Sequence, residues 1–323
     1  MNIHQKIEQY IVHHKLLHHN DTLIIGLSGG PDSVFLLHTL ISLQSKYNLT
    51  LIAAHLNHEW RHEAHDEEAL CHTIAQKHNI PCVSAKLSSL QSNIKYNGSK
   101  EEYARKMRRF FLENVAREYN AHHIALGHHA QDQQETFFMR LIRGSSLAGL
   151  TAMHPQQGMY IRPLLEINKE EILHYLHTHT IAYAIDASNT NQDFLRNRIR
   201  TTVLPSLSEC DSRFDNNFAL TLQRLHKENA LLDSLTKTAL ASILITIDNT
   251  QTLDVSKFIA LDSALHHRLI IQWLISYNVQ FPITSSFLDE IIRFLFNPNG
   301  GTHTVHKQWS IVKKQKKAFI IEK

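Results

Sequence analysis

A glycine-rich turn between a short apolar segment and a longer helical segment is the feature that most constrains the fold of this chain. Residues 23–27 are largely apolar, residues 26–33 read Gly-Leu-Ser-Gly-Gly-Pro-Asp-Ser, and a helical pattern follows over residues 33–45. Small residues let backbone N–H groups approach an anion closely, and the helix N-terminus adds a favourable dipole. The pattern predicts a phosphate-binding loop at the end of a strand, although a plain tight turn is the simpler alternative. The expected binding residues are Ser28, Gly29, Gly30, Pro31, Asp32 and Ser33.

The region from residue 22 to about residue 165 alternates between short apolar runs and longer amphipathic segments. Strands are expected at residues 23–27, 51–56, 82–87, 123–126 and 160–164, and helices at residues 33–45, 66–78, 99–119 and 132–142. Ser99 and Glu102 have the spacing of a capping box at the start of the third helix. Strands separated by helices in this order predict an α/β fold, a parallel twisted sheet with helices on both faces.

The pattern changes after residue 165. Asn168 is expected to cap one more helix, and helical segments are expected at residues 214–244, 262–276 and 284–296, before a turn cluster at residues 297–301 and short strands to the end. A chain of 323 residues is near the size at which one core gives way to two. We therefore expect two domains, residues 1–208 and residues 209–323, the second being smaller, mainly helical and ending in short strands.

Composition excludes several classes of protein. The longest apolar runs are far shorter than the roughly 20 residues of a membrane span, and the N-terminus lacks the apolar region of a signal peptide, which predicts a cytoplasmic protein. Three cysteines without a C-x-x-C pair give little support for disulfides, a thiolate zinc site or an iron–sulfur cluster. The 25 histidines are scattered, so they are interpreted as composition rather than as metal ligands.

A second motif follows the fourth expected strand: residues 127–136 read Gly-His-His-Ala-Gln-Asp-Gln-Gln-Glu-Thr. Asp132 and Glu135 are three residues apart and share a helix face, with Phe137, Phe138 and Leu141 expected to face a core. The carboxylates would lie at the C-terminal edge of the sheet, where α/β folds bind ligands. They suit Mg²⁺ or a substrate ammonium, and the alternative is that they only complement the helix dipole.

Arginines form two further groups. Arg105 and Arg108 flank an apolar helix stripe and are expected to lie at the edge of a site where phosphate charge develops. The alternative is that Arg105 only forms an exposed ion pair with Glu101. Arg196 and Arg200 are four residues apart with no acid between them, so their helix face is expected to attract phosphate from ATP or RNA.

These motifs carry a family resemblance over about residues 20–210. The S-G-G-x-D-S run at residues 28–33 resembles the pyrophosphate loop of the N-type ATP pyrophosphatases, the PP-loop superfamily, whose fold is adenine nucleotide alpha hydrolase-like. The runs at residues 57–61, 101–108, 127–144, 186–189 and 196–200 resemble motifs of the tRNA(Ile)-lysidine synthetases within that class. The chain departs from that pattern at Gln131, where many members have an acid.

The resemblance implies a carbon–nitrogen ligase of tRNA modification. With ATP and Mg²⁺, such an enzyme joins free L-lysine to C2 of the wobble cytidine of the CAU-anticodon isoleucine tRNA, through an adenylated cytidine, and releases AMP and pyrophosphate. It implies that Asp32 helps to place Mg²⁺ and that Arg105 and Arg200 steady the phosphoryl charge. Asp132, with Glu135 behind it, would orient the lysine ammonium or accept its proton.

Six basic residues are expected to contact phosphates of the tRNA. They are Arg108, Arg196, Lys313, Lys314, Lys316 and Lys317. Lysines on edge strands also block aggregation, which is the alternative for the last four. A tRNA thiolase, a PP-loop amidating synthetase and an RNA-binding module with an inactive site remain as alternative functions. The sequence leaves the oligomeric state open, a homodimer included.

Overall fold

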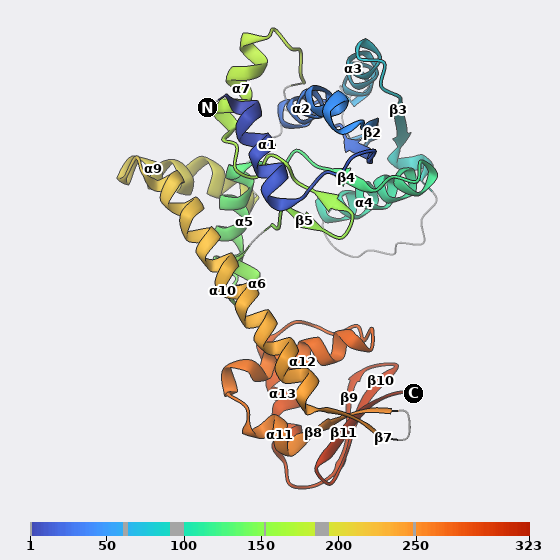
Figure 1. Ribbon diagram of the computed structural model, residues 1–323, viewed down its shortest axis with the longest axis vertical. Helices are drawn as coiled ribbons and strands as arrows, with labels where there is room; N and C mark the ends of the chain where they lie inside the picture. Colours follow the sequence, from blue (N-terminus) through green and yellow to red (C-terminus); the bar gives the residue numbers. More distant parts are fainter. Residues whose placement is uncertain (1, 61–63, 91–99, 152, 185–193, 248–249) are drawn as a thin grey trace. The chain divides into compact units, whose positions relative to one another are not determined.

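The computed structural model describes residues 2–60, 64–90, 100–151, 153–184, 194–247 and 250–323, apart from the side chain of Glu101 (Figure 1). The chain divides into two units, residues 1–222 and residues 223–323. The division between residues 222 and 223 falls within the long helix Phe214–Ile243. The domain boundary inferred from the sequence, after residue 208, stays a prediction. Among the helices in the described part of the chain, none combines the length and the apolar character that crossing a membrane requires.

A six-stranded sheet forms the centre of the first unit. Its strands are β1 (Thr22–Gly26), β2 (Thr50–Asn57), β3 (Cys82–Lys86), β4 (His123–Ala125), β5 (Gln156–Gln157) and β6 (Tyr160–Ile161). They lie in the order β3-β2-β1-β4-β6-β5, and every neighbouring pair is parallel except β5 and β6. The parallel sheet is therefore confirmed. The last expected strand is shorter than predicted, since Pro163 has no N–H with which to continue the ladder.

Helices cover both faces of this sheet (Figure 1). Leu23 and Ile25 of β1 belong to a core with α1 (Ile3–His14), α2 (Pro31–Tyr47), α3 (Ala64–Lys77) and α7 (Lys169–Thr178). Ile24, which points to the other face, belongs to a core with α4 (Lys100–Glu118). The alternation follows from the two-residue period of a strand. It confirms the α/β class.

The predicted helices form within a few residues of their expected ends. Asn168 caps α7, its N–H donating to the Glu171 carboxylate at 2.9 Å. Ser99, the expected cap of α4, lies outside the described residues. The remaining elements of this unit are η1 (Leu87–Ser89), α5 (Ala130–Ile142), α6 (Leu147–Leu150), α8 (Leu195–Arg198), η3 (Ile199–Val203), α9 (Leu204–Cys210) and the start of α10 (Phe214–Ile243).

The second unit combines the rest of α10 with three helices and a five-stranded antiparallel sheet (Figure 1). The helices are α11 (Val255–Ala260), α12 (Ser263–Ser276) and α13 (Ser285–Phe296), and the strands are β7 (Leu244–Ile247), β8 (Thr250–Asp254), β9 (Gly301–His306), β10 (Trp309–Lys314) and β11 (Lys317–Glu322). Trp273 and Phe258 lie fully buried in its core. The C-terminal strands were expected, whereas the β7–β8 hairpin was not.

Candidate active site

The glycine-rich turn is closed on itself by its two serines. The Ser33 hydroxyl donates to the Gly30 carbonyl at 2.9 Å, accepts the Ser28 N–H at 3.1 Å and lies 3.1 Å from the Ser28 hydroxyl. Gly29 has φ +81°, a conformation that favours glycine. Pro31 is the first residue of α2, where its missing N–H costs nothing. The loop thus places two hydroxyls and a helix N-terminus together, as a phosphate site requires.

Gly127 brings the second motif against this loop. A Cβ atom at Gly127 would lie 2.8 Å from the Asp32 carbonyl oxygen and 3.1 Å from the Ser33 nitrogen, a distance at which something must shift. Only glycine lets the end of β4 pack so closely on the first turn of α2. The chain then enters α5, which carries Asp132 in its first turn.

A buried histidine lies between the carboxylates of the two motifs. His129 Nε2 is 3.7 Å from an Asp32 oxygen and 3.5 Å from an Asp132 oxygen, and its backbone N–H donates to Asp132 at 2.9 Å. On its other side Asp32 pairs with Lys169, whose Nζ is 2.5 Å away at the start of α7. The sequence analysis missed His129 and Lys169. Their signal was position: both adjoin the first turn of a helix that follows the sheet.

Arg196 and Arg200 extend the same network. Arg196 donates to Asp132 and to Glu135 at 2.5 Å each, and Arg200 donates to Glu135 at 2.5 Å. Glu135 is fully buried. The expectation that the arginines form an unneutralised face is therefore wrong, because α5 supplies the acids. These contacts form two groups, Lys169 with Asp32 and Asp132 with Arg196, Glu135 and Arg200, and the His129 side chain lies between the groups.

Electrostatics keep Asp132 ionised despite its burial. Burial alone would raise the pKa of Asp132, but His129, the Arg196 guanidinium and the backbone N–H of His129 outweigh it and hold that pKa below the ordinary value. Burial lowers the pKa of His128 to about 3, so this imidazole is neutral at pH 7. In this site the pKa of the Asp132 carboxyl and the pKa of the His128 imidazole both lie below their ordinary values.

Three further arginines, Arg105, Arg108 and Arg162, lie close together. Arg105 is exposed, Arg108 is half-buried, and Arg162, which follows β6, is only 8% exposed. Burial, then the charge of Arg105, lowers the pKa of both Arg108 and Arg162. Within the described residues no carboxylate lies within ion-pair distance of any of the three. Arg162 donates to the His154 carbonyl at 2.8 Å, and its Nε is buried without a hydrogen-bond partner.

Comparisons with known proteins bear on this geometry. Residues 1–207 match a family model described as a PP-loop domain. The chain belongs to the PP-loop domain family. It is 31% identical over 299 residues to a tRNA(Ile)-lysidine synthase of Bacillus cereus, covering 90% of this chain and 63% of that protein. It is 33% identical over 312 residues to the "Bifunctional protein TilS/HprT" of Listeria innocua, covering 95% of this chain and 45% of that protein. The PP-loop chain thus spans less than two thirds of these relatives' lengths.

A solved structure is similar to this PP-loop chain at the level of the fold. The U34-tRNA thiolase NcsA from Methanococcus maripaludis, with its [4Fe-4S] cluster, superposes with a TM-score of 0.57 at 21% identity, covering 68% of this chain and 78% of that one. The family match and the fold together confirm the resemblance inferred from residues 28–33.

The residues around the PP-loop site have mixed outcomes. Gln131, at the departure from the family pattern, accepts the Lys169 N–H at 2.9 Å and so fixes the start of α7. Phe137 and Phe138 pack against aromatic rings of α10, as expected of apolar residues. Leu141 is 49% exposed, so its predicted core position is wrong. Arg61 and residues 186–189 lie outside the described residues.

Lys313 does not belong to an exposed basic patch. It is 4% exposed, and its Nζ donates to the Leu295 carbonyl at 2.7 Å and to the Asn297 carbonyl, at the C-terminus of α13. Its ammonium therefore caps a helix end, which corrects its assignment to tRNA binding. Exposed lysines remain at the β10–β11 turn; they are Lys314, Lys316 and Lys317.

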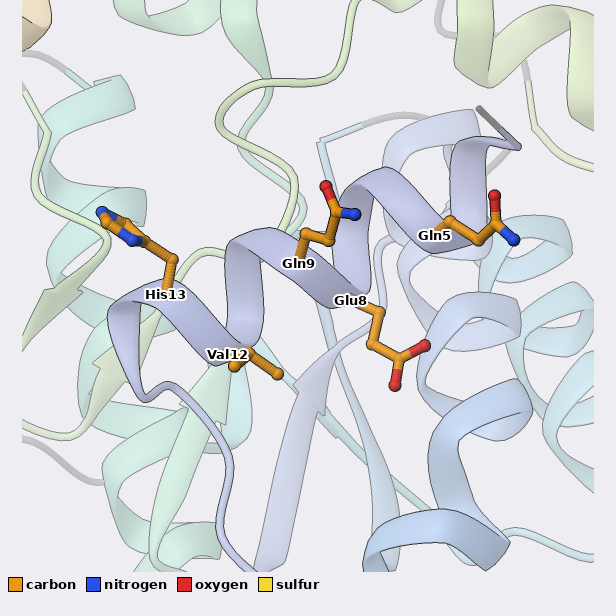
Figure 2. Close-up of a pocket in the computed structure, with 5 residues that line it drawn as sticks. All are labelled: Gln5, Glu8, Gln9, Val12 and His13. Carbon is orange, nitrogen blue, oxygen red and sulfur yellow. The ribbon is translucent and has the colours of Figure 1, made fainter.

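A surface depression lies on α1 (Figure 2). Its lining residues are Gln5, Glu8, Gln9, Val12 and His13. All five side chains come from one helix, and none belongs to the PP-loop network or to a motif of the sequence analysis. Glu8 is paired with Lys46 of α2. The depression is therefore attributed to the surface of α1 and not to the candidate active site.

Proposed function

We propose that this chain forms lysidine: it adenylates C2 of the wobble cytidine of a CAU-anticodon isoleucine tRNA and then joins free L-lysine to that carbon. The observation that carries the proposal is the proximity of the phosphate loop to α5, with one histidine side chain between their carboxylates. Through His129, the loop residue Asp32 and the α5 residue Asp132 share one site. The curated relatives named tRNA(Ile)-lysidine synthase cover most of this chain and support the same activity.

The first half of the reaction needs groups that hold a triphosphate. The loop offers the hydroxyls of Ser28 and Ser33 at the N-terminus of α2. Arg105, Arg108 and Arg162 offer positive charge that no acid within the described residues neutralises. Preorganised cations are most effective where phosphoryl charge develops, because they cost no rearrangement at that moment. These arginines would steady the departing pyrophosphate and the RNA backbone beside it.

Mg²⁺ fits the carboxylate of Asp32. Its Oδ1 is paired with Lys169 and its Oδ2 faces His129 at 3.7 Å, beyond hydrogen-bond distance, so one oxygen is available to a hard cation. When bound, Mg²⁺ would neutralise phosphate charge. The Asp32 carboxylate would then be bound both by Lys169 and by the metal ion. The Lys169 ammonium would lie close enough to turn toward the phosphates.

Asp132 is assigned to the lysine substrate. A carboxylate whose pKa lies below the ordinary value is a poor proton acceptor near pH 7, but it binds an ammonium well. Arg196 and the His129 N–H hold its two oxygens in place. Asp132→Asn should therefore raise the KM for lysine or block the second step, while pyrophosphate release partly survives. Normal use of lysine with failed ATP engagement would instead assign the carboxylate to the metal.

The decisive experiment combines the chain with ATP, labelled L-lysine and a CAU-anticodon isoleucine tRNA transcript. We expect label in the RNA and release of AMP and pyrophosphate. The matched control is the same transcript with uridine at the wobble position, which should take up no label. Pyrophosphate release without label in any tRNA would refute lysidine formation and leave a PP-loop enzyme with another acceptor.

A sulfur-transfer function is disfavoured by the cysteines of the fold. Cys71 Sγ would lie 3.4 Å from a Cβ at Gly29, directly beside the loop, but burial raises the pKa of this thiol to about 12. Burial likewise raises the pKa of Cys82 to about 11. Sulfur relay needs a thiolate, so the buried thiol of Cys71 and the partly buried thiol of Cys82 are unsuited to it.

A further inference from the structure

A buried carboxylate lies at the edge of the first sheet that is remote from the loop. Asp21 immediately precedes β1 and is 5% exposed. The loop follows the C-terminal end of β1, and β4, which runs parallel to β1, begins at His123. Asp21 and the start of β4 therefore meet at the N-terminal edge of the sheet, where the proposed reaction uses no residue.

Three imidazoles surround this carboxylate. His18 Nδ1 and His123 Nε2 lie 3.7 and 3.8 Å from Asp21 Oδ2, and His122 Nδ1 lies 3.8 Å from Asp21 Oδ1. These distances are too long for hydrogen bonds. One ligand atom each from His18, Asp21 and His123 falls within 4.8 Å of the others. Ligand atoms around a tetrahedral zinc ion are about 3.3 Å apart, given metal–ligand bonds of about 2.0–2.1 Å, so small inward shifts complete the geometry.

The charge of Asp21 also favours a bound cation. In the part of the chain that the structure describes, no lysine or arginine lies within ion-pair distance of Asp21, whose carboxylate accepts the His18 N–H at 2.7 Å. A buried carboxylate with no lysine or arginine beside it lacks a compensating cation, and imidazole nitrogens are common metal ligands.

His122 differs from the other two histidines. Its Nδ1 accepts the Thr22 N–H at 2.9 Å, so that lone pair is occupied. The free ligand set is therefore two imidazoles and one carboxylate, with a fourth position for water. Imidazole suits zinc and its neighbours in the first transition row, and two imidazoles with a carboxylate are too nitrogen-rich for Mg²⁺ or Ca²⁺.

We propose that His18, Asp21 and His123 bind a zinc-type divalent metal ion. The ion joins the connection between α1 and β1 to the first residue of β4, and so fixes the N-terminal edge of the sheet. Its role is structural, because the loop and the α5 carboxylates lie at the opposite ends of the same strands.

The test is zinc binding by the full chain after removal of metals with a chelator. Calorimetric titration with ZnCl₂ should show one tight site per chain, and zinc should raise the Tm of the first unit. His18→Asn changes an exposed side chain, so it should leave the fold intact yet weaken zinc binding by at least roughly tenfold. His123→Gln should do the same. The matched control is His267→Gln, whose histidine pairs with Asp289 in the second unit and should leave zinc binding unchanged.

Crystals grown with zinc locate the ion independently. An anomalous peak between His18, Asp21 and His123 is expected. Tight binding that survives in His18→Asn and His123→Gln, or a peak only at another histidine pair such as His128 and His129, would overturn the proposal.

Discussion

Glu135 offers the sharpest test of the network, because two arginines depend on it. Its carboxylate accepts from Arg196 Nε at 2.5 Å, from Arg200 Nε at 2.5 Å and from Arg200 Nη2 at 3.2 Å. It is fully buried, and its partners lie 61 and 65 residues further along the chain. Glu135→Gln keeps the shape of the side chain and removes the charge. We expect this change to release α8 and η3 from α5.

The size of the effect follows from the contacts. Hydrogen bonds to charged groups contribute roughly 1.5–3 kcal/mol each. Glutamine keeps one accepting oxygen but turns an NH₂ group toward the arginines, so about two of the bonds are lost. The side chains of Arg196 and Arg200 are 33% and 37% exposed, so water recovers part of the loss. We expect the local free energy of opening to fall by about 2 kcal/mol, below the roughly 3–5 kcal/mol of a fully buried pair.

Hydrogen exchange followed by mass spectrometry measures this opening directly. A loss of about 2 kcal/mol corresponds to roughly 30-fold faster exchange in peptides from residues 194–204. The matched control is Asp211→Asn, which breaks an exposed pair with Arg213 and should leave those peptides unchanged. Equal exchange in Glu135→Gln and in this control would refute the view that the buried pair holds α8 and η3 in place.

Three other outcomes are expected. Asp32→Ala should abolish pyrophosphate release and leave tRNA affinity nearly unchanged; a mutant with near-normal turnover would remove Asp32 from the mechanism. Changing three exposed lysines to alanine should weaken binding to all tRNAs alike and flatten the slope of log affinity against log salt by roughly 0.7–0.9 per lost phosphate contact, whereas an unchanged slope would leave them as solvated edge residues; they are Lys314, Lys316 and Lys317. Burial, then the charge of His78, lowers the pKa of His38 from 6.5 to about 4. Between those pH values the unfolded chain therefore binds more protons at His38 than the folded chain does. The contribution of neutral His38 to the free energy of unfolding is complete above pH 6.5 and is lost as the pH drops toward 4. His38→Gln should reduce the loss seen in urea unfolding between pH 7 and pH 5, and an unaltered loss would contradict the assignment.

The fold was predictable wherever its signals are local. The apolar run before residue 26, the glycine turn and the Asn168 cap each depend on a few neighbouring residues, and each gave an element close to its observed bounds. The β7–β8 hairpin was missed because its first strand continues directly from α10, without a glycine or proline to mark the change.

The site was predictable only in its separate parts. Asp132 and Glu135 were found from their spacing on one helix, but their pairing with Arg196 depends on contacts more than 60 residues apart in sequence. Lys313 shows a signal that was available and not used. In a strand, residues two apart share a face, and Ile311 of β10 is fully buried. Its neighbour on that face was therefore a poor choice for a solvent-exposed RNA contact.

The separation between Glu135 and its arginines also sets an order of events during translation. Arg196 leaves the ribosome 61 residues after Glu135, and chain growth at roughly 5–20 residues per second makes this a delay of about 3–12 seconds. During that interval the nascent sheet carries two carboxylates on α5 with no guanidinium to pair with them. The ion pairs of Asp132 and Glu135 with Arg196 and Arg200 can therefore form only after most of the first unit has been translated. A ribosome pause inserted between codons 135 and 196 would lengthen the time for which these carboxylates lack their partners.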